Sequence, residues 1–320
     1  MIKIFDCSNS NERPQNRGNG GPIENDIMCY LKRYASIYDC IFVSDIESAD
    51  IIITNDVFPT YTTYYNVPKI KRMDGVFFQE QYRERNESLN LAARQANHVI
   101  FISKFSQDAY NHLYGDGIRS SSVALNQVDP SIFYSNDCTS INHPIDFITA
   151  ANNWGRPEKR FQNIIDFAEL IDGYLYIIGS VANVSLPSNI VLLGYIHEPI
   201  NINKVIGTID AFVNFSYKDA APKTVLQGLC CGLPVLYANS GGLPELANGY
   251  GYGIFDNNEH KFENNIPLLS KSSIKIGYDN FIKNFSIYKK ALTNRKNFDM
   301  FKNMLDEYFF QIRRLAHETR

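Results

Sequence analysis

The sequence predicts an α/β protein with two domains, each built around a parallel β-sheet that helices cover on both faces. A chain of 320 residues is long enough for two domains. Short apolar strands alternate with amphipathic helices from residue 211 to residue 246, a pattern typical of buried parallel sheets. A polar segment at 134–144 interrupts the strands, so we expect a first domain at 1–143 and a second at 144–299.

Composition and charge narrow the functional classes. The apolar share of 44% and the charged share of 20% are ordinary for a soluble globular protein, and a net charge of −3 gives no support for a nucleic-acid partner. No apolar run approaches the roughly 20 residues that span a bilayer, and the chain starts with a strand rather than a signal peptide. The six cysteines show neither a disulfide framework nor metal-ligand spacing. We therefore expect a cytoplasmic protein, for which peripheral membrane contact remains open.

The stretch 211–246 organises the second half of the chain. Its residues predict a strand at 211–215, a loop at 216–222, a helix at 223–231, a strand at 234–238, a glycine-rich turn at 240–242 and another helix from 244. Gly232 and Pro234 mark the end of the first of these helices. Because ligands of parallel sheets bind at the carboxyl ends of the strands, both loops lie at the expected binding edge.

The loop and helix around Lys223 favour a ligand with phosphates and hydroxyls. The N–H groups and the dipole at the start of a helix favour an anion. Asp219 lies in the preceding loop, and Gln227 lies one turn inside the helix. An anion cradle beside side chains that accept hydrogen bonds suits a nucleotide sugar.

The same stretch matches the frame of a known motif without gaps. Asp219 is followed after seven residues by Gln227, then by the run Cys230-Cys231-Gly232-Leu233-Pro234-Val235 and by Gly241-Gly242-Leu243-Pro244-Glu245. This block resembles the donor-binding segment of retaining glycosyltransferases of family 4. In that family, glutamates occupy both positions that Asp219 and Gln227 hold here. An ordinary α/β unit would explain the glycines alone.

The resemblance implies the GT-B fold, in which two doubly wound, Rossmann-like domains face a cleft. It also implies transfer of a hexosyl group from a nucleotide-diphosphate sugar to an acceptor hydroxyl in glycan or glycoconjugate synthesis. The expected donor is a UDP- or GDP-sugar. Retention of the anomeric configuration and independence of metals and other cofactors belong to the same expectation. Asp219 would hold sugar hydroxyls and Gln227 the ribose, while Lys223, Thr224 and Val225 would form the donor-binding start of the helix.

A basic loop follows the first predicted strand of the second domain. Its cations suit a diphosphate, which presents two adjacent charges. By position, Arg156 and Lys159 match the arginine and lysine with which the resembling family grips the donor diphosphate, and Arg160 is a substitute for either. A solvated basic turn is the alternative.

The first half carries weaker signals. Gly20 and Gly21 lie in a long loop where the resembling family approaches the donor from the opposing domain, although a flexible surface loop would look the same. Asp74 follows the segment 69–73. A carboxylate there could orient the acceptor hydroxyl or steady an oxocarbenium-like charge, but Asp-Gly is also a common turn. His98 is expected to be a strand residue with a satisfied ring and no catalytic role.

Two positions in the second half complete the expectations. Tyr195 follows a predicted strand and could stack on the nucleotide base or simply pack. The C-terminal helix, at about 300–320, is expected to pack back on the first domain, as in the resembling fold.

Two other functions remain open. One is a nucleotide-sugar epimerase of related fold, which a second carboxylate near Asp74 would favour. The other is a degenerate, non-catalytic nucleotide-sugar-binding protein. The amide of Gln227, at a position where the family has a glutamate, keeps this second alternative open.

Overall fold

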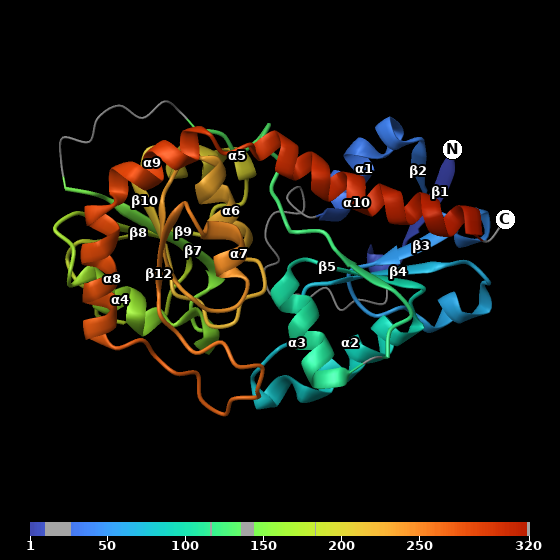
Figure 1. Ribbon diagram of the computed structural model, residues 1–320, viewed down its shortest axis with the longest axis horizontal. Coiled ribbons are helices and arrows are strands. Elements are labelled where there is room, and N and C mark those ends of the chain that lie inside the picture. Colours follow the sequence, from blue (N-terminus) through green and yellow to red (C-terminus); the bar gives the residue numbers. More distant parts are fainter. Residues whose placement is uncertain (10–26, 116, 136–143, 183, 319–320) are drawn as a thin grey trace. The chain divides into compact units, whose positions relative to one another are not determined.

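The computed structural model describes residues 1–9, 27–115, 117–135, 144–182 and 184–318 (Figure 1). Contacts divide the chain into two units. Unit 1 comprises Met1–Asn126, His260–Asn264 and Met300–Arg320, and unit 2 comprises Gln127–Glu259 and Asn265–Asp299. The expected boundary between residues 143 and 144 borders the segment 136–143, which lies outside the described residues.

Unit 1 contains a six-stranded parallel sheet. Its strands are β1 (Ile2–Asp6), β2 (Cys40–Val43), β3 (Ile51–Thr54), β4 (Lys69–Met73), β5 (His98–Phe101) and β6 (Ser121–Val123), in the spatial order β2-β1-β3-β4-β5-β6. In the register, Ile4 lies opposite Ile51 and Ile70 opposite His98. The strands are short, and nearly half of their residues are β-branched, as expected for a sheet that is buried on both faces.

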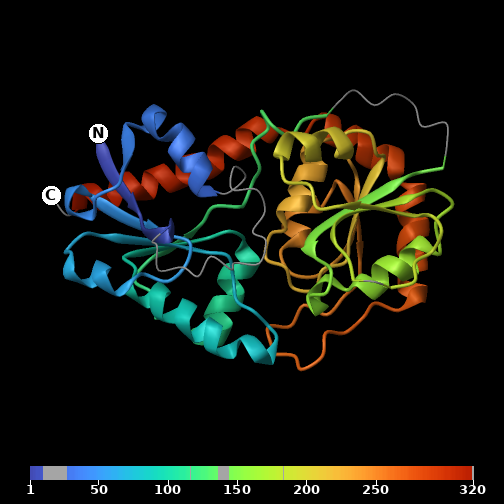
Figure 2. The ribbon, with the colours of Figure 1, turned by 180° about the vertical axis from the view of Figure 1, so that it is seen from behind.

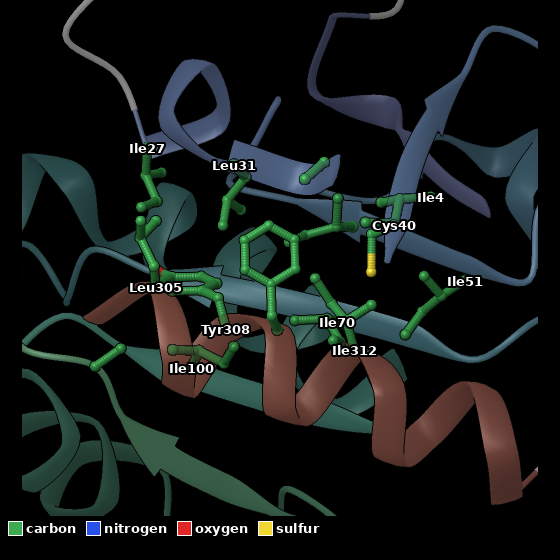
Figure 3. Close-up of a cluster of buried hydrophobic side chains, with 14 of the residues drawn as sticks. Ile4, Ile27, Leu31, Cys40, Ile51, Ile70, Ile100, Leu305, Tyr308 and Ile312 are labelled. Atoms are coloured by element: carbon green, nitrogen blue, oxygen red, sulfur yellow. The ribbon is translucent and has the colours of Figure 1, made fainter. Parts of the chain in front are cut away.

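Helices cover both faces of this sheet. They are α1 (Ile27–Tyr34), α2 (Arg83–Gln95), α3 (Lys104–Tyr114) and most of α10 (Asn297–Glu318). Figure 3 shows Leu305, Tyr308 and Ile312 of α10 packed against strand isoleucines such as Ile70 and Ile100. The other face packs against α2 and α3.

Unit 2 contains a second six-stranded parallel sheet. Its strands are β7 (Phe147–Asn153), β8 (Leu175–Ser180), β9 (Ile190–Gly194), β10 (Ala211–Asn214), β11 (Val235–Ala238) and β12 (Gly251–Ile254), in the order β12-β11-β10-β7-β8-β9. Its helices are α4 (Phe161–Ala168), α5 (Pro199–Ile206), α6 (Lys223–Cys230), α7 (Leu243–Ala247), α8 (Lys271–Lys283) and α9 (Phe285–Thr293). These two parallel sheets with flanking helices confirm the predicted fold class.

The helices of unit 2 form a layer on each face of its sheet (Figures 1 and 2). On one face, Phe167 of α4 and Phe281 of α8 share a buried core with Phe147 and Val213 of the strands. On the opposite face, α6 lies directly on β10. The contact is so close that a Cβ added at Gly228 of α6 would lie 2.8 Å from the ring of Phe212. Alternation of side chains along β10 sends Phe212 and Val213 to these two faces.

Short 3-10 helices connect the main elements. They span Cys7–Asn9, Ala35–Tyr38, Ile46–Ser48, Thr60–Tyr64, Glu80–Tyr82 and Pro157–Lys159. The last of these carries the basic loop that follows β7.

Local sequence signals explain the element boundaries around the site. β10 begins at Ala211, α6 begins at Lys223 and β11 ends at Ala238, which confirms the predicted order of elements. Gly232, with φ +78°, follows α6 in the left-handed conformation that glycine adopts without strain.

Candidate active site

The strand order of unit 2 defines one place where a ligand is expected. From β7 the chain proceeds through β8 to β9 on one side, and then returns to β10 and proceeds to β12 on the other. The order therefore reverses between the neighbours β7 and β10, and such a switch point opens a crevice at the carboxyl ends of the two strands. The loops that follow β7 and β10 meet there.

Lys159 and Asp219 come together at this switch point. Lys159 ends the 3-10 helix after β7, and Asp219 lies in the loop after β10. The Nζ atom of Lys159 donates a hydrogen bond to Oδ2 of Asp219 at 2.7 Å. The side chains are 16% and 23% exposed, so both remain within reach of a solvent-borne ligand. Two of the predicted site residues, 60 positions apart in the sequence, thus form one ion pair.

The glycine-rich turn fixes the backbone of Asp219. The N–H of Gly242 donates to the carbonyl oxygen of Asp219 at 2.9 Å. Gly241 adopts φ +66°, and a Cβ placed there would lie 2.2 Å from the same carbonyl oxygen. Only glycine satisfies both the left-handed conformation and the close approach.

The three adjacent cations of the basic loop have different environments. Arg160 is 1% exposed, and its guanidinium binds Asp256 through Nη1 at 2.6 Å and Nη2 at 3.2 Å. This buried bidentate pair holds Arg160 in the interior of unit 2. The Arg156 side chain is 45% exposed and pairs with Glu158. Lys159 and Arg156 are therefore the cations of this loop that a ligand can reach.

The start of α6 lies next to Asp219 in the sequence. The Val225 N–H already donates to the carbonyl of Pro222 at 3.1 Å, while Lys223 and Thr224 are half-buried. Gln227 is 4% exposed, and its amide side chain hydrogen-bonds to none of the described residues. This amide can both donate to and accept from a ligand.

The remaining predicted residues lie elsewhere or outside the described chain. Asp74 follows β4 in unit 1, where its exposed side chain pairs with Arg72. Tyr195 follows β9 in unit 2 and contacts the ring of His197 at a centroid distance of 4.6 Å. Gly20 and Gly21 lie outside the described residues.

Lys218 is a site-adjacent residue that the sequence did not reveal. It is 5% exposed, has φ +51° and places its ammonium 4.7 Å from the centroid of the Tyr217 ring. Its N–H donates to Oγ of Ser240 at 3.0 Å, which ties the loop after β10 to the turn before α7. A lysine directly before Asp219 was the only available signal, since its burial depends on the tertiary fold.

Two further properties concern metals and membranes. Within the described ranges, no three His, Cys, Asp or Glu side chains gather as a metal-binding group. The described helices also include none that is long and apolar enough to cross a membrane.

Comparison with known proteins identifies structural relatives. Neither a protein-family model nor a curated protein matches the sequence at a significant level. The solved structure of Anabaena HepE in complex with UDP-glucose is similar with a TM-score of 0.65 and 15% identity, covering 100% of this chain and 99% of that one. A glycosyltransferase from Rickettsia africae is similar with a TM-score of 0.59 and 14% identity, covering 90% of this chain and 87% of that one. Sucrose-phosphate synthase from Thermosynechococcus elongatus is similar with a TM-score of 0.60 and 13% identity, covering 91% of this chain and 75% of that one.

The chain has the GT-B glycosyltransferase fold. Identities near 15% establish the fold alone, so its chemistry has to be argued from the site.

Proposed function

We propose that this protein is a retaining glycosyltransferase of family 4 type that moves a hexosyl group from a UDP- or GDP-sugar to an acceptor hydroxyl. The Lys159–Asp219 pair at the switch point of the unit 2 sheet is the observation on which the proposal rests most. Similar solved structures in complex with UDP-glucose, or with UDP and GlcNAc, support a UDP-sugar in particular. The reaction would need no metal or other cofactor and would belong to glycan or glycoconjugate synthesis in the cytoplasm.

The roles of the site residues follow from charge and position. Lys159 and Arg156 would neutralise the diphosphate as it becomes a leaving group, together with the N–H groups at the start of α6 near Thr224. Asp219 would accept hydrogen bonds from sugar hydroxyls, and Gln227 would bond the ribose. A diphosphate would attract Lys159 away from Asp219, which frees that carboxylate for the sugar. Asp74 would act on the acceptor side.

The test is a binding and turnover experiment on the full chain. Titration calorimetry with UDP, GDP, UDP-glucose and GDP-mannose would identify the nucleotide. We expect Lys159→Ala to lower both nucleotide affinity and turnover by about tenfold or more, the scale of losing one charge-stabilising group. Lys204→Ala, an exposed lysine on α5, is the matched control and should behave as the native chain.

The outcomes separate the candidate functions. Native affinity in Lys159→Ala would remove that residue from the site. Nucleotide-sugar binding without transfer to any acceptor would favour the non-catalytic protein, and conversion of the donor without an acceptor would favour the epimerase. No described feature currently favours either of these two.

A further inference from the structure

Unit 2 contains a large cavity at the opposite end of α6 from the Asp219 loop. Its volume is about 1160 Å³, and it lies between the C-terminal end of α6, helix α9 and the segments 130–135 and 295–299. Helix α6 runs from Lys223 to Cys230, so its ends are separated by about 10 Å. All the described residues that line the cavity belong to unit 2, and none of them belongs to the candidate active site.

Arg295 is a buried cation in the wall of this cavity. It is 6% exposed, and its guanidinium lies 5.6 Å from the centroid of the Tyr250 ring. Its Nη1 atom donates to Oδ1 of Asn297 and lies 3.7 Å from Sγ of Cys230. In the described part of the chain, Nε and Nη2 have no hydrogen-bond partner, and no carboxylate forms an ion pair with Arg295.

The two unpartnered groups identify the kind of ligand. Nε and Nη2 lie along one edge of the planar guanidinium, and two parallel N–H donors on one edge bind a carboxylate or a phosphate in bidentate fashion. A buried charge without a partner is strongly destabilising, and buried polar groups are otherwise almost always satisfied. The charge of Arg295 therefore favours an oxyanion as the ligand of this cavity.

The nearby groups that the structure describes do not supply that negative charge. Burial raises the pKa of the Cys230 thiol, so the thiol stays neutral beside Arg295. The carboxylate of Asp129, whose charge also acts on Cys230, accepts hydrogen bonds from the N–H and Oγ of Ser131 at 2.9 and 2.7 Å. Asp299 is the one acidic side chain among the described residues that line the cavity.

The rest of the lining combines cations with apolar walls. Lys289, Lys290 and Lys296 line the cavity, and Nζ of Lys289 donates to the carbonyl of Gly232 at 3.1 Å. The apolar walls come from Pro130, Phe133, Leu229, Phe285, Leu292 and Phe298. A cavity of about 1160 Å³ is much larger than an isolated phosphate needs and is as large as a pocket for a drug-sized ligand.

We propose that this cavity, the Arg295 pocket, binds an amphiphilic oxyanion, that is, a carboxylate or phosphate headgroup attached to an apolar chain. The headgroup binds beside Arg295 and the lysines that line the cavity, and its apolar chain packs along the apolar walls. The pocket is separate from the nucleotide-sugar site, so this proposal does not depend on the proposed function.

The test is titration calorimetry of the full chain with four probes below their micellar concentrations: decyl phosphate, decanoate, inorganic phosphate and decan-1-ol. We expect decyl phosphate, decanoate or both to bind, and the tighter of the two identifies the headgroup. Arg295→Gln should weaken that binding by about tenfold or more, since it removes a positive charge from the cavity wall. Arg313→Gln, an exposed arginine on α10 in unit 1, is the matched control and should leave it unchanged.

A second variant covers the case in which Arg295→Gln does not fold. Ser286 is exposed and lines the cavity. Ser286→Trp should therefore obstruct the place where the apolar chain of the ligand binds, without touching Arg295 or the core. We expect it also to weaken binding of the decyl probes. The proposal is overturned if neither decyl anion binds, if decan-1-ol or inorganic phosphate binds as tightly as the decyl anions, or if both variants bind them as the native chain does.

Discussion

Lys71 on β4 shows how burial sets the charge state of a single side chain. It is fully buried, and its ammonium donates to the carbonyl of Arg72. Burial lowers the pKa of Lys71 to about 8, and the positive charges of Arg72 and Arg85 act in the same direction, while Asp74 and Asp56 oppose the shift. At neutral pH, the folded protein therefore carries a buried charge that the unfolded chain solvates.

We expect Lys71→Met to change the pH dependence of stability. Below pH 8 the native chain keeps Lys71 charged in the interior, and above its unfolded pKa near 10.5 the residue is neutral in both states. The stability of the variant relative to the native chain should therefore fall by roughly 3 kcal/mol as pH rises from 8 to 10.5. Urea unfolding of both proteins between pH 8 and pH 10.5 measures this difference in stability. Lys3→Met, at an exposed position of β1, should show no such trend, and an equally flat difference for Lys71→Met would contradict the prediction.

His98 on β5 makes a prediction on the acidic side. Its ring nitrogens lie 2.9 and 3.0 Å from the hydroxyls of Ser120 and Ser122, which confirms the expected satisfied ring. Burial, followed by the charge of Arg314, lowers the pKa of His98 to about 4, against smaller opposing effects of Glu307 and Glu318.

The unfolded chain protonates His98 first as the pH falls from 6.5 to 4. The native protein should therefore lose roughly 3 kcal/mol of stability in this window through His98. His98→Gln should flatten that part of the curve in urea titrations, whereas His197→Gln, at an exposed position, should not. A curve for His98→Gln that stays parallel to the native one would exclude this origin.

At the scale of elements, the glycine-rich turn between β11 and α7 positions a side chain on another loop. Gly241 lies against the backbone of Asp219, and Gly249 also has a positive φ but has nothing within 4 Å of its added Cβ. Substituting alanine for Gly249 therefore tests the cost of backbone strain alone, whereas substituting it for Gly241 adds a steric clash with Asp219.

We expect Gly241→Ala to displace the Asp219 loop. Gly249→Ala should cost about 1 kcal/mol, the scale of left-handed strain, and should bind nucleotide as the native chain does. Gly241→Ala should cost more and should also weaken nucleotide-sugar binding, because Asp219 O and the new methyl cannot occupy the same space. Thermal unfolding and calorimetry with UDP-glucose measure both effects. Equal behaviour of the two variants would show that the turn does not position Asp219.

At the scale of the whole molecule, segments from late in the sequence complete unit 1. Residues His260–Asn264 and Met300–Arg320 belong to it, although they follow the sheet of unit 2. The N–H of Glu263 donates to the carbonyl of Phe78 at 2.7 Å. On α10, Phe309 is fully buried and stacks on Tyr38 at 4.2 Å. The core of unit 1 is therefore incomplete without helix α10.

We expect Phe309→Ala to destabilise unit 1 selectively. Losing a fully buried phenylalanine costs about 3–5 kcal/mol. Hydrogen–deuterium exchange should show lost protection in β1 to β6 and retained protection in β7 to β12, and Phe281→Ala, in the unit 2 core, should give the reverse. Phe310→Ala, 54% exposed on the same helix, should change stability by no more than about 0.5 kcal/mol. Loss of protection throughout the chain in Phe309→Ala would mean that the two cores unfold together.

The sequence by itself determined the elements around the site and the fold class. Apolar spacing, Gly232 and Pro234 act on neighbouring residues, so β10, α6 and β11 could be predicted to within one or two positions. The parallel sheets follow from the same local pattern, because parallel neighbours need a crossover connection, which is usually a helix. The GT-B fold itself was predicted from the resemblance of the block at 219–245.

Only the tertiary structure decided how the charges are used. Lys159 and Arg160 are adjacent cations, and the sequence offers Arg160 as a substitute for Lys159, yet Lys159 faces Asp219 at the sheet edge and Arg160 is buried against Asp256. The same is true of Arg295, which is buried and forms no ion pair with any residue that the structure describes. Pairing of charges and burial depend on which strands become neighbours. Strand order is set by contacts between residues far apart in the chain. Local sequence patterns do not predict these contacts.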